Sequence, residues 1–129
     1  MSDKSDAEVT AGIGRLPISS VVFWSLMDRW GLPDEKSLAL IDRSEGFTRS
    51  GKRPRFALST EQARRLSYLL EVEANLQRTG EDAGRWITRR NSARMFGGSS
   101  PLDYMITHGL EGFADTLKFL NRRALERST

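Results

Sequence analysis

Residues 59–77 read STEQARRLSYLLEVEANLQ, and this stretch decides the fold class. Ser59 followed by Gln62 is a capping box, in which each side chain bonds the other residue's backbone N–H and so fixes where a helix begins. The apolar residues that follow recur three and four positions apart, which is the spacing of one helix face. We therefore predict a helix from residue 59 to about residue 77 whose buried face carries Ala63, Leu66, Leu69, Leu70 and Leu76.

Two helices are predicted on the N-terminal side of this stretch. The first covers residues 20–30 and stops at Gly31, and its apolar face is formed by Val22, Phe23, Leu26, Met27 and Trp30. The second is short and ends by Arg43. Residues 1–17 contain two glycines and a proline without a sustained period, so we expect a disordered arm there.

Three more helices are predicted after residue 77. Thr79, with Asp82 three positions later, is expected to cap a helix that carries Trp86 on its buried face and ends near Asn91. The last helix covers about residues 110–126.

Between these two lies a short helix with a strong start signal. Ser100 is the expected N-cap, and Pro101 occupies the first helical position, where its missing N–H costs nothing. Because no alternating strand pattern of useful length is present, the sequence predicts an all-α protein of about six helices.

The sequence is poor in two residue types, cysteine and histidine, on which many enzyme classes rely for catalysis. The 129 residues include no cysteine and one histidine, His108, so the chain lacks a thiolate nucleophile, a disulfide and a metal site rich in cysteine or histidine. The carboxylate pairs Glu71 with Glu73 and Glu81 with Asp82 lie one or two positions apart, where helical side chains do not face each other. We therefore expect a binding protein without catalytic residues, metal or cofactor, built as one domain or two small sub-domains.

Neither a secretory leader nor a membrane span is predicted. The first eight residues are polar with mixed charge, and no run of about 18 apolar residues occurs. We expect a cytoplasmic protein with no membrane partner.

Two clusters of cations are present, although the net charge is only +3. The first cluster either contacts nucleic-acid phosphates or belongs to a solvated loop, and the sequence leaves both interpretations open; its members are Arg43, Arg49, Lys52, Arg53 and Arg55. The second is either the polar face of an amphipathic helix, which we favour, or a contact with an acidic partner; it comprises Arg85, Arg89, Arg90 and Arg94.

A series of short motifs occurs in order between residues 64 and 124. They are Arg65-Leu66-Ser67-Tyr68-Leu69-Leu70, Trp86, Asn91, Phe96-Gly97-Gly98, Ser100-Pro101-Leu102-Asp103-Tyr104-Met105, Gly109-Leu110-Glu111-Gly112-Phe113 and residues 117–120. In this order and spacing they resemble the C-terminal toxin-binding domain of the Xre/MbcA/ParS antitoxin family, over about half of the chain.

This resemblance implies a non-enzymatic antitoxin of a bacterial type II toxin–antitoxin system. Its partner would be a RES-domain toxin, which consumes NAD or transfers ADP-ribose from it, and the antitoxin domain would cover the toxin's active site. The toxin-binding residues implied for this sequence are Trp86, Asn91, Phe96, Gly97, Gly98, Pro101, Asp103 and Met105. Arg122 and Arg123, at the basic end of the last helix, would reach toward the toxin's nucleotide-binding cleft.

The resemblance also implies a division of the chain. Residues 18–58 would be a helix-turn-helix-like region, with its recognition helix at 44–51, and residues 59–129 the helical toxin-binding domain. The first region would bind operator DNA through the first cation cluster, so that the complex represses its own operon, and a homodimer is the usual state of helix-turn-helix proteins. Two alternatives stay open: a stand-alone DNA-binding transcriptional regulator without a toxin partner, and an orphan interaction module whose toxin gene is lost.

Overall fold

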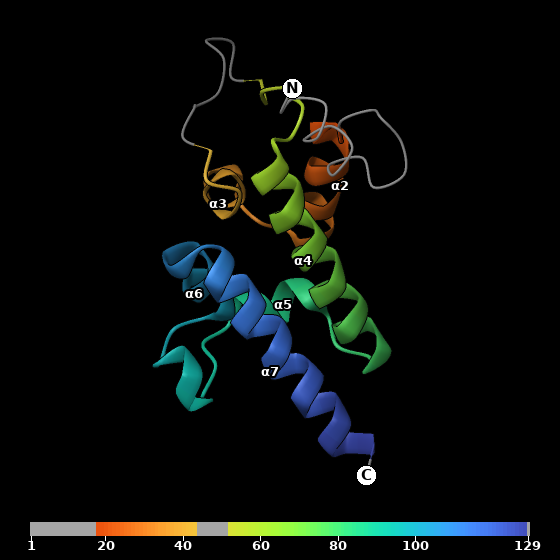
Figure 1. Cartoon of the computed structure of the whole chain (residues 1–129), viewed down its shortest axis with the longest axis vertical. Coiled ribbons are helices and arrows are strands. Elements are labelled where there is room, and N and C mark those ends of the chain that lie inside the picture. The colour runs from red at the N-terminus through yellow and green to blue at the C-terminus, as the bar shows by residue number, and fades with distance from the viewer. Residues whose placement is uncertain (1–17, 44–51, 129) are drawn as a thin grey trace.

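The computed structural model describes residues 18–43 and 52–128. Within these residues the chain forms six α-helices, one 3-10 turn and a single isolated β-bridge between Ser19 and Ala57, which confirms the all-α prediction (Figure 1). The predicted arm at 1–17 and the recognition helix expected at 44–51 lie outside the described residues. The helices are α2 (Ser20–Trp30), α3 (Asp34–Leu40), α4 (Thr60–Arg78), α5 (Ala83–Thr88), α6 (Pro101–His108) and α7 (Leu110–Ser128), and the 3-10 turn is η1 (Arg94–Phe96).

The predicted starts of α4 and α6 are confirmed by their hydrogen bonds. Ser59 Oγ accepts from the backbone N–H of Gln62 at 3.1 Å, and Gln62 Oε1 accepts from the backbone N–H of Ser59 at 2.9 Å. Ser100 Oγ accepts from the backbone N–H of Asp103 at 3.1 Å, with Pro101 at the first helical position. Each start is encoded within four consecutive residues, so local sequence was sufficient to locate it.

The predicted cap of α5 is wrong by three residues. Asp82 precedes the helix, and its Oδ1 accepts a hydrogen bond from the backbone N–H three residues on, at 3.1 Å. Thr79 instead closes α4, because its hydroxyl donates to the carbonyl oxygen of Leu76 at 3.0 Å. Gly80 follows with a φ of +75°, which turns the chain out of α4 before the next helix begins. α5 then ends at Thr88, earlier than predicted.

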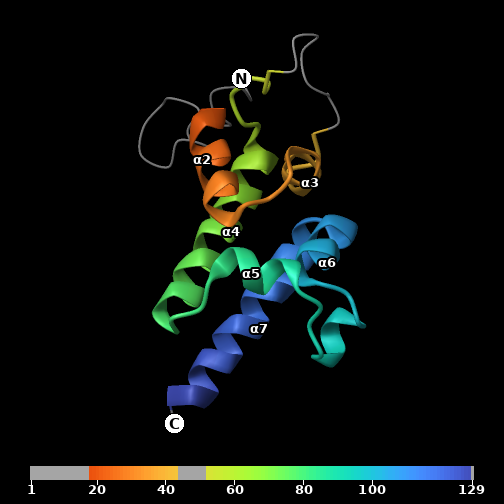
Figure 2. The same cartoon turned by 180° about the vertical axis from the view of Figure 1, so that it is seen from behind.

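Helix α4 is shared by two groups of helices, as the front and back views show (Figures 1 and 2). α2 and α3 lie beside its first half in Figure 1. α7 packs along α4 and is covered by α6, while α2 contacts α5 and α3 contacts α6. One continuous core joins both groups, so the regions 18–58 and 59–129 have no separate cores within the described residues. Its members from successive helices include Phe23, Leu26, Leu40, Leu69, Val72, Ile87, Met105, Phe113 and Leu120.

Two residues predicted to be buried are exposed. Val22 is 44% exposed and Leu70 is 38% exposed. The fully buried positions beside them are Phe23 and Leu69, and one step along a helix turns a side chain by about 100°. Val22 and Leu70 therefore lie at the edges of their apolar faces.

The two groups of helices are also joined by polar contacts. Glu73 on α4 accepts two hydrogen bonds from the guanidinium of Arg29, at 2.9 and 3.1 Å, and one from the indole N–H of Trp30, at 3.2 Å. Arg65 Nη1 donates to the carbonyl oxygen of Leu40 at 2.9 Å. Glu73 and Arg65 are both buried, so these bonds fix how α2 and α3 sit on α4.

Helix α5 passes so close to the end of α2 that glycine is required at residue 84. A Cβ on Gly84 would lie 2.9 Å from the carbonyl carbon of Trp30 and closer still to its oxygen. Since these are backbone atoms, any larger residue would push the two helices apart. Gly84 thereby sets the position of Trp86 two residues later.

Candidate functional site

An aromatic cluster holds the C-terminal half together. The rings of Trp86 and Phe119 stack with their centroids 6.3 Å apart, and Phe96 meets Trp86, Phe119 and Tyr104 edge-on at 6.1, 5.3 and 5.4 Å. Trp86 is 7% exposed and Phe96 is 2% exposed. These two toxin-binding candidates are therefore parts of the core, and they fix the loop between α5 and α6 against α7.

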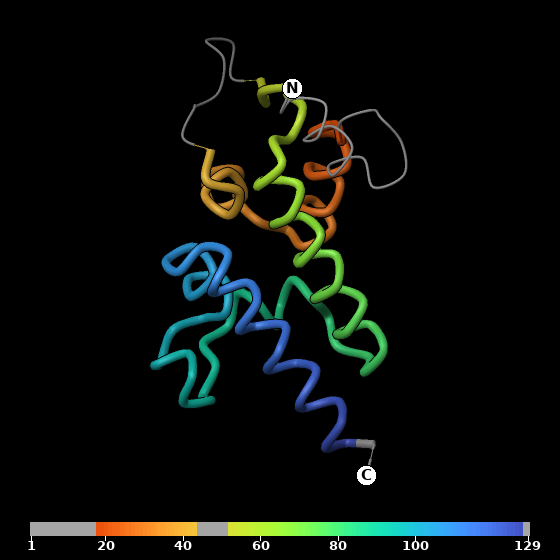
Figure 3. The backbone as a smooth tube through the Cα atoms, viewed as in Figure 1, coloured from red at the N-terminus to blue at the C-terminus, as the bar shows by residue number. Residues whose placement is uncertain are grey.

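The loop itself, residues 91–99, is closed by its own backbone (Figure 3). Asn91 Oδ1 accepts a hydrogen bond from the backbone N–H of Ala93 at 2.9 Å, and the backbone N–H of Asn91 donates to the carbonyl oxygen of Ser99 at 3.2 Å. Gly97 and Gly98 both have positive φ, +58° and +87°, and Gly97 ends η1 in the left-handed conformation. Asn91, Gly97 and Gly98 thus set the loop's shape.

Of the toxin-binding candidates on α6, two are buried and one is exposed. Pro101 and Met105 are buried, and Met105 is fully so. Asp103 is exposed, and its Oδ1 accepts from Lys36 Nζ on α3 at 3.2 Å. Such an exposed pair contributes about 1 kcal/mol or less to stability, so Asp103 remains accessible to a partner.

One surface pocket beside the aromatic cluster combines apolar and charged side chains. It has a volume of about 210 Å³ and is lined by Met95, Asp115, Lys118, Phe119 and Arg122. Met95 and Phe119 are half-buried, while Lys118 and Arg122 are exposed. Asp115 Oδ2 already accepts from the hydroxyl of Tyr104 at 2.9 Å, and burial together with this carboxylate raises the pKa of Tyr104. We call this feature the Met95–Phe119 pocket.

Arg123, the neighbour of Arg122, has internal partners. It forms an ion pair with Glu81, and its guanidinium lies 5.7 Å from the centre of the Trp86 ring. Arg127 also reaches Glu81, at 3.6 Å. Of the two terminal arginines implied to enter a toxin cleft, Arg122 is therefore the more accessible.

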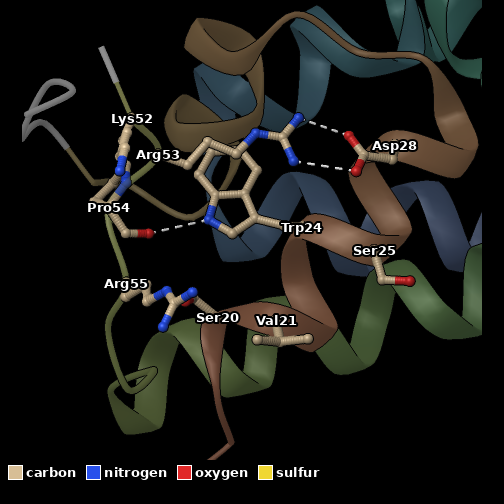
Figure 4. A pocket seen from close by; sticks show the side chains of 9 residues that line it. All are labelled: Ser20, Val21, Trp24, Ser25, Asp28, Lys52, Arg53, Pro54 and Arg55. Atoms are coloured by element: carbon tan, nitrogen blue, oxygen red, sulfur yellow. Dashed lines mark hydrogen bonds and ion pairs between the residues drawn. The ribbon is translucent and has the colours of Figure 1, made fainter. Parts of the chain in front are cut away.

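The N-terminal cations have different environments. Arg53 bonds Asp28 at 2.6 and 3.1 Å, and its guanidinium lies 4.4 Å from the ring centre of Trp24 (Figure 4). It also bonds Asp34 at 3.1 and 3.2 Å. These hydrogen bonds raise the pKa of Arg53, and the bond from Arg53 lowers the pKa of Asp28. The guanidinium of Arg43 covers the ring of Phe56 at 3.8 Å.

Lys52 and Arg55 are exposed, whereas Arg49 lies outside the described residues. Lys52, Arg53 and Arg55 line a pocket of about 550 Å³ beside α2, where the indole N–H of Trp24 donates to the carbonyl oxygen of Pro54 at 3.2 Å (Figure 4). The sequence did not predict this pocket, because its two walls lie about thirty residues apart. The first cation cluster is thus partly folded into the protein and partly exposed.

Three of the four arginines in the second cluster lie around Trp86. Arg85 and Arg89 line a pocket of about 290 Å³ that also includes Glu81 and Asp82. A neighbouring pocket of about 210 Å³ is lined by Trp86, Arg89, Arg90, Asn91 and Ser92. Arg94 begins η1 and lines neither of these two pockets.

Two kinds of feature are absent from the described residues, a metal-binding group and a membrane-spanning helix. In residues 18–43 and 52–128 no three His, Cys, Asp or Glu side chains are grouped to hold a metal ion. In the same residues no helix is both long and apolar enough to cross a bilayer. The ring of His108, exposed at the end of α6, lies 4.3 Å from the ring of Tyr104.

Searches against family models, curated proteins and solved structures give no match to this chain.

Proposed function

We propose that this protein is a non-enzymatic antitoxin whose helical C-terminal half binds a RES-like toxin and covers its active site. The resemblance of residues 64–124 to the Xre/MbcA/ParS toxin-binding domain suggests the partner. The observation that carries the proposal is the Met95–Phe119 pocket, where half-buried apolar side chains are rimmed by Lys118 and Arg122 on a fixed scaffold. Methionine, aromatic side chains and arginine are enriched where proteins bind one another.

In this proposal buried and accessible residues have different roles. Of the implied toxin-binding residues, Trp86, Phe96 and Met105 are buried, so they shape the surface without touching the toxin. Met95 and Phe119, which were not among the implied residues, are accessible enough to supply its apolar centre. Binding energy at such interfaces comes mainly from a few anchors of this kind.

The cations at the rim suggest how the toxin's active site is covered. A site that takes NAD must accommodate the pyrophosphate of that cofactor, and arginine pairs well with phosphate or with the carboxylates around it. Arg122 is exposed at the pocket's edge, whereas Arg123 is paired with Glu81. We therefore assign the contact with the cleft to Arg122.

The first experiment is to isolate the tagged full-length protein from its natural host at high salt and to identify stoichiometric partners by mass spectrometry. A RES-domain partner is expected to stay bound, because an interface with an apolar centre resists salt. The purified pair is then assayed for NAD consumption, which the antitoxin should inhibit. A protein that is recovered alone, and that binds a promoter fragment only at low salt, would support the alternative of a stand-alone DNA-binding regulator.

Once a partner has been identified, amino-acid substitutions can locate the interface. Met95→Asp and Arg122→Glu should each weaken inhibition at least about tenfold, the effect expected for an anchor near the centre of an interface. The matched control is Arg64→Glu, which reverses an exposed charge on α4 away from the Met95–Phe119 pocket. Equal inhibition by all three variants would contradict the proposed interface.

A further inference from the structure

The second pocket beside Trp86 is lined almost entirely by hydrogen-bond donors. Its lining residues are Trp86, Arg89, Arg90, Asn91 and Ser92, and the side chain of each carries an N–H or O–H donor. Asn91 Oδ1 accepts from the backbone of Ala93, which leaves the Nδ2 amide as the donating end. No carboxylate lines this pocket. The donor set therefore matches an anionic ligand.

The carboxylates nearest in sequence are already used within the protein. Glu81 is shared by Arg123, Arg127 and the hydroxyl of Thr79. Asp82 accepts the backbone N–H that starts α5. Between residues 83 and 100 the sequence contains four arginines and no acidic residue. The cations around Trp86 thus lack compensating acidic residues on their own segment.

The exposed side chains of this surface are polar throughout. Arg85, Thr88, Arg89, Arg90 and Ser92 are exposed, whereas Trp86 and Ile87, the large apolar residues among them, are buried. Protein interfaces usually need aromatic or aliphatic anchors, which this surface lacks. Phosphate groups of nucleic acids are contacted by arginine, serine, threonine and asparagine side chains.

Spacing on the helix favours repeated phosphates over a single one. Arg85 lies on α5 and Arg89, four positions later, is the residue that caps its C-terminal end, so their Cβ atoms lie about 5–6 Å from each other. Arg90, the next residue, lines the same pocket as Arg89. Such a row fits an extended phosphodiester backbone.

We propose that Arg85, Arg89 and Arg90 form a contact site for the phosphate backbone of nucleic acid. The site lies on α5 and the two residues after it. It is distant in sequence from the cations at 52–55, for which the family resemblance implies contact with operator DNA. It does not depend on the proposed antitoxin function, since it uses residues outside the Met95–Phe119 pocket.

The test uses the full-length protein and short fluorescent duplexes of arbitrary sequence, one of DNA and one of RNA, in a polarisation assay. Three phosphate contacts predict a slope of about −2.7 in log affinity against log salt, and hence a loss of roughly fortyfold between 50 and 200 mM salt. The variant R85Q/R89Q/R90Q should lose most of that slope, about one unit for each arginine. Whichever duplex binds more tightly, DNA or RNA, is the nucleic acid whose phosphates the site contacts. Either result supports the proposed site.

The matched control is K36Q/R64Q/R78Q, which removes three exposed cations outside both cation clusters and gives the same net charge. Its affinity should stay within about threefold of the parent protein, because it keeps the proposed phosphate contacts. Circular dichroism establishes that both variants are folded. The proposal is overturned if the parent protein does not bind, if the control loses as much affinity as R85Q/R89Q/R90Q, or if polyglutamate competes as well as nucleic acid. That last result would assign the surface to an acidic protein.

Discussion

The bonds that Glu73 receives allow its contribution to stability to be worked out. Glu73→Ala removes the acceptor of three hydrogen bonds and leaves the indole N–H of Trp30, a buried residue, without a partner. A buried donor left unsatisfied costs about 1–3 kcal/mol. The side chain of Arg29 is 50% exposed, so solvent screening limits its ion pair to about 0.5–1 kcal/mol. We expect a total loss of roughly 2–3 kcal/mol.

Urea unfolding measures this loss. With a slope of about 1–3 kcal/mol per molar urea, a loss of roughly 2–3 kcal/mol should lower the midpoint of Glu73→Ala by about 0.7–3 M. Glu71→Ala is the matched control, because Glu71 is exposed on the same helix, and it should change the stability by no more than about 0.5 kcal/mol. Glu73→Gln keeps an acceptor for Trp30 and should fall between the two. Equal midpoints for Glu73→Ala and Glu71→Ala would refute the reasoning.

Three further predictions concern other contacts. Gly84→Ala should destabilise the protein by about 1–3 kcal/mol through overlap with the backbone of Trp30, and an unchanged Tm would contradict this close approach. Asp82→Ala should cost about 1 kcal/mol by removing the cap of α5, which urea unfolding would detect, and full stability would rule Asp82 out as the cap. Because the bond from Arg53 lowers the pKa of Asp28, this carboxylate stabilises the fold above about pH 4, and the contribution is lost as pH falls through the lowered pKa. Asp28→Asn should therefore show a weaker loss of stability in acid, and identical pH dependence in both proteins would contradict it.

Local sequence signals were sufficient to predict the helices, but not every first and last residue of each helix. The capping box of Ser59 and the Ser100–Pro101 start lie within a few residues, so the sequence predicted both. The cap of α5 was misplaced because threonine and aspartate are both good N-caps, and the left-handed turn at Gly80 decides between them.

The environments of charged residues could not be predicted from local sequence. Arg53 lies in a basic run, yet its partners Asp28 and Asp34 come from 25 and 19 residues away. Glu73 similarly meets Arg29 across 44 residues. Periodicity identifies which face of a helix is polar, but it does not show which polar residue finds a partner once the helices pack.

The sharing of α4 by both groups of helices bears on how this chain can change during evolution. A recombination event that exchanged residues 59–129 for those of another protein would also remove one wall of the core that buries Phe23 and Leu40. It would take away the acceptor of the Trp30 indole as well. New interaction surfaces are therefore expected to arise by substitution on exposed faces such as that of α5, while the two halves are inherited together.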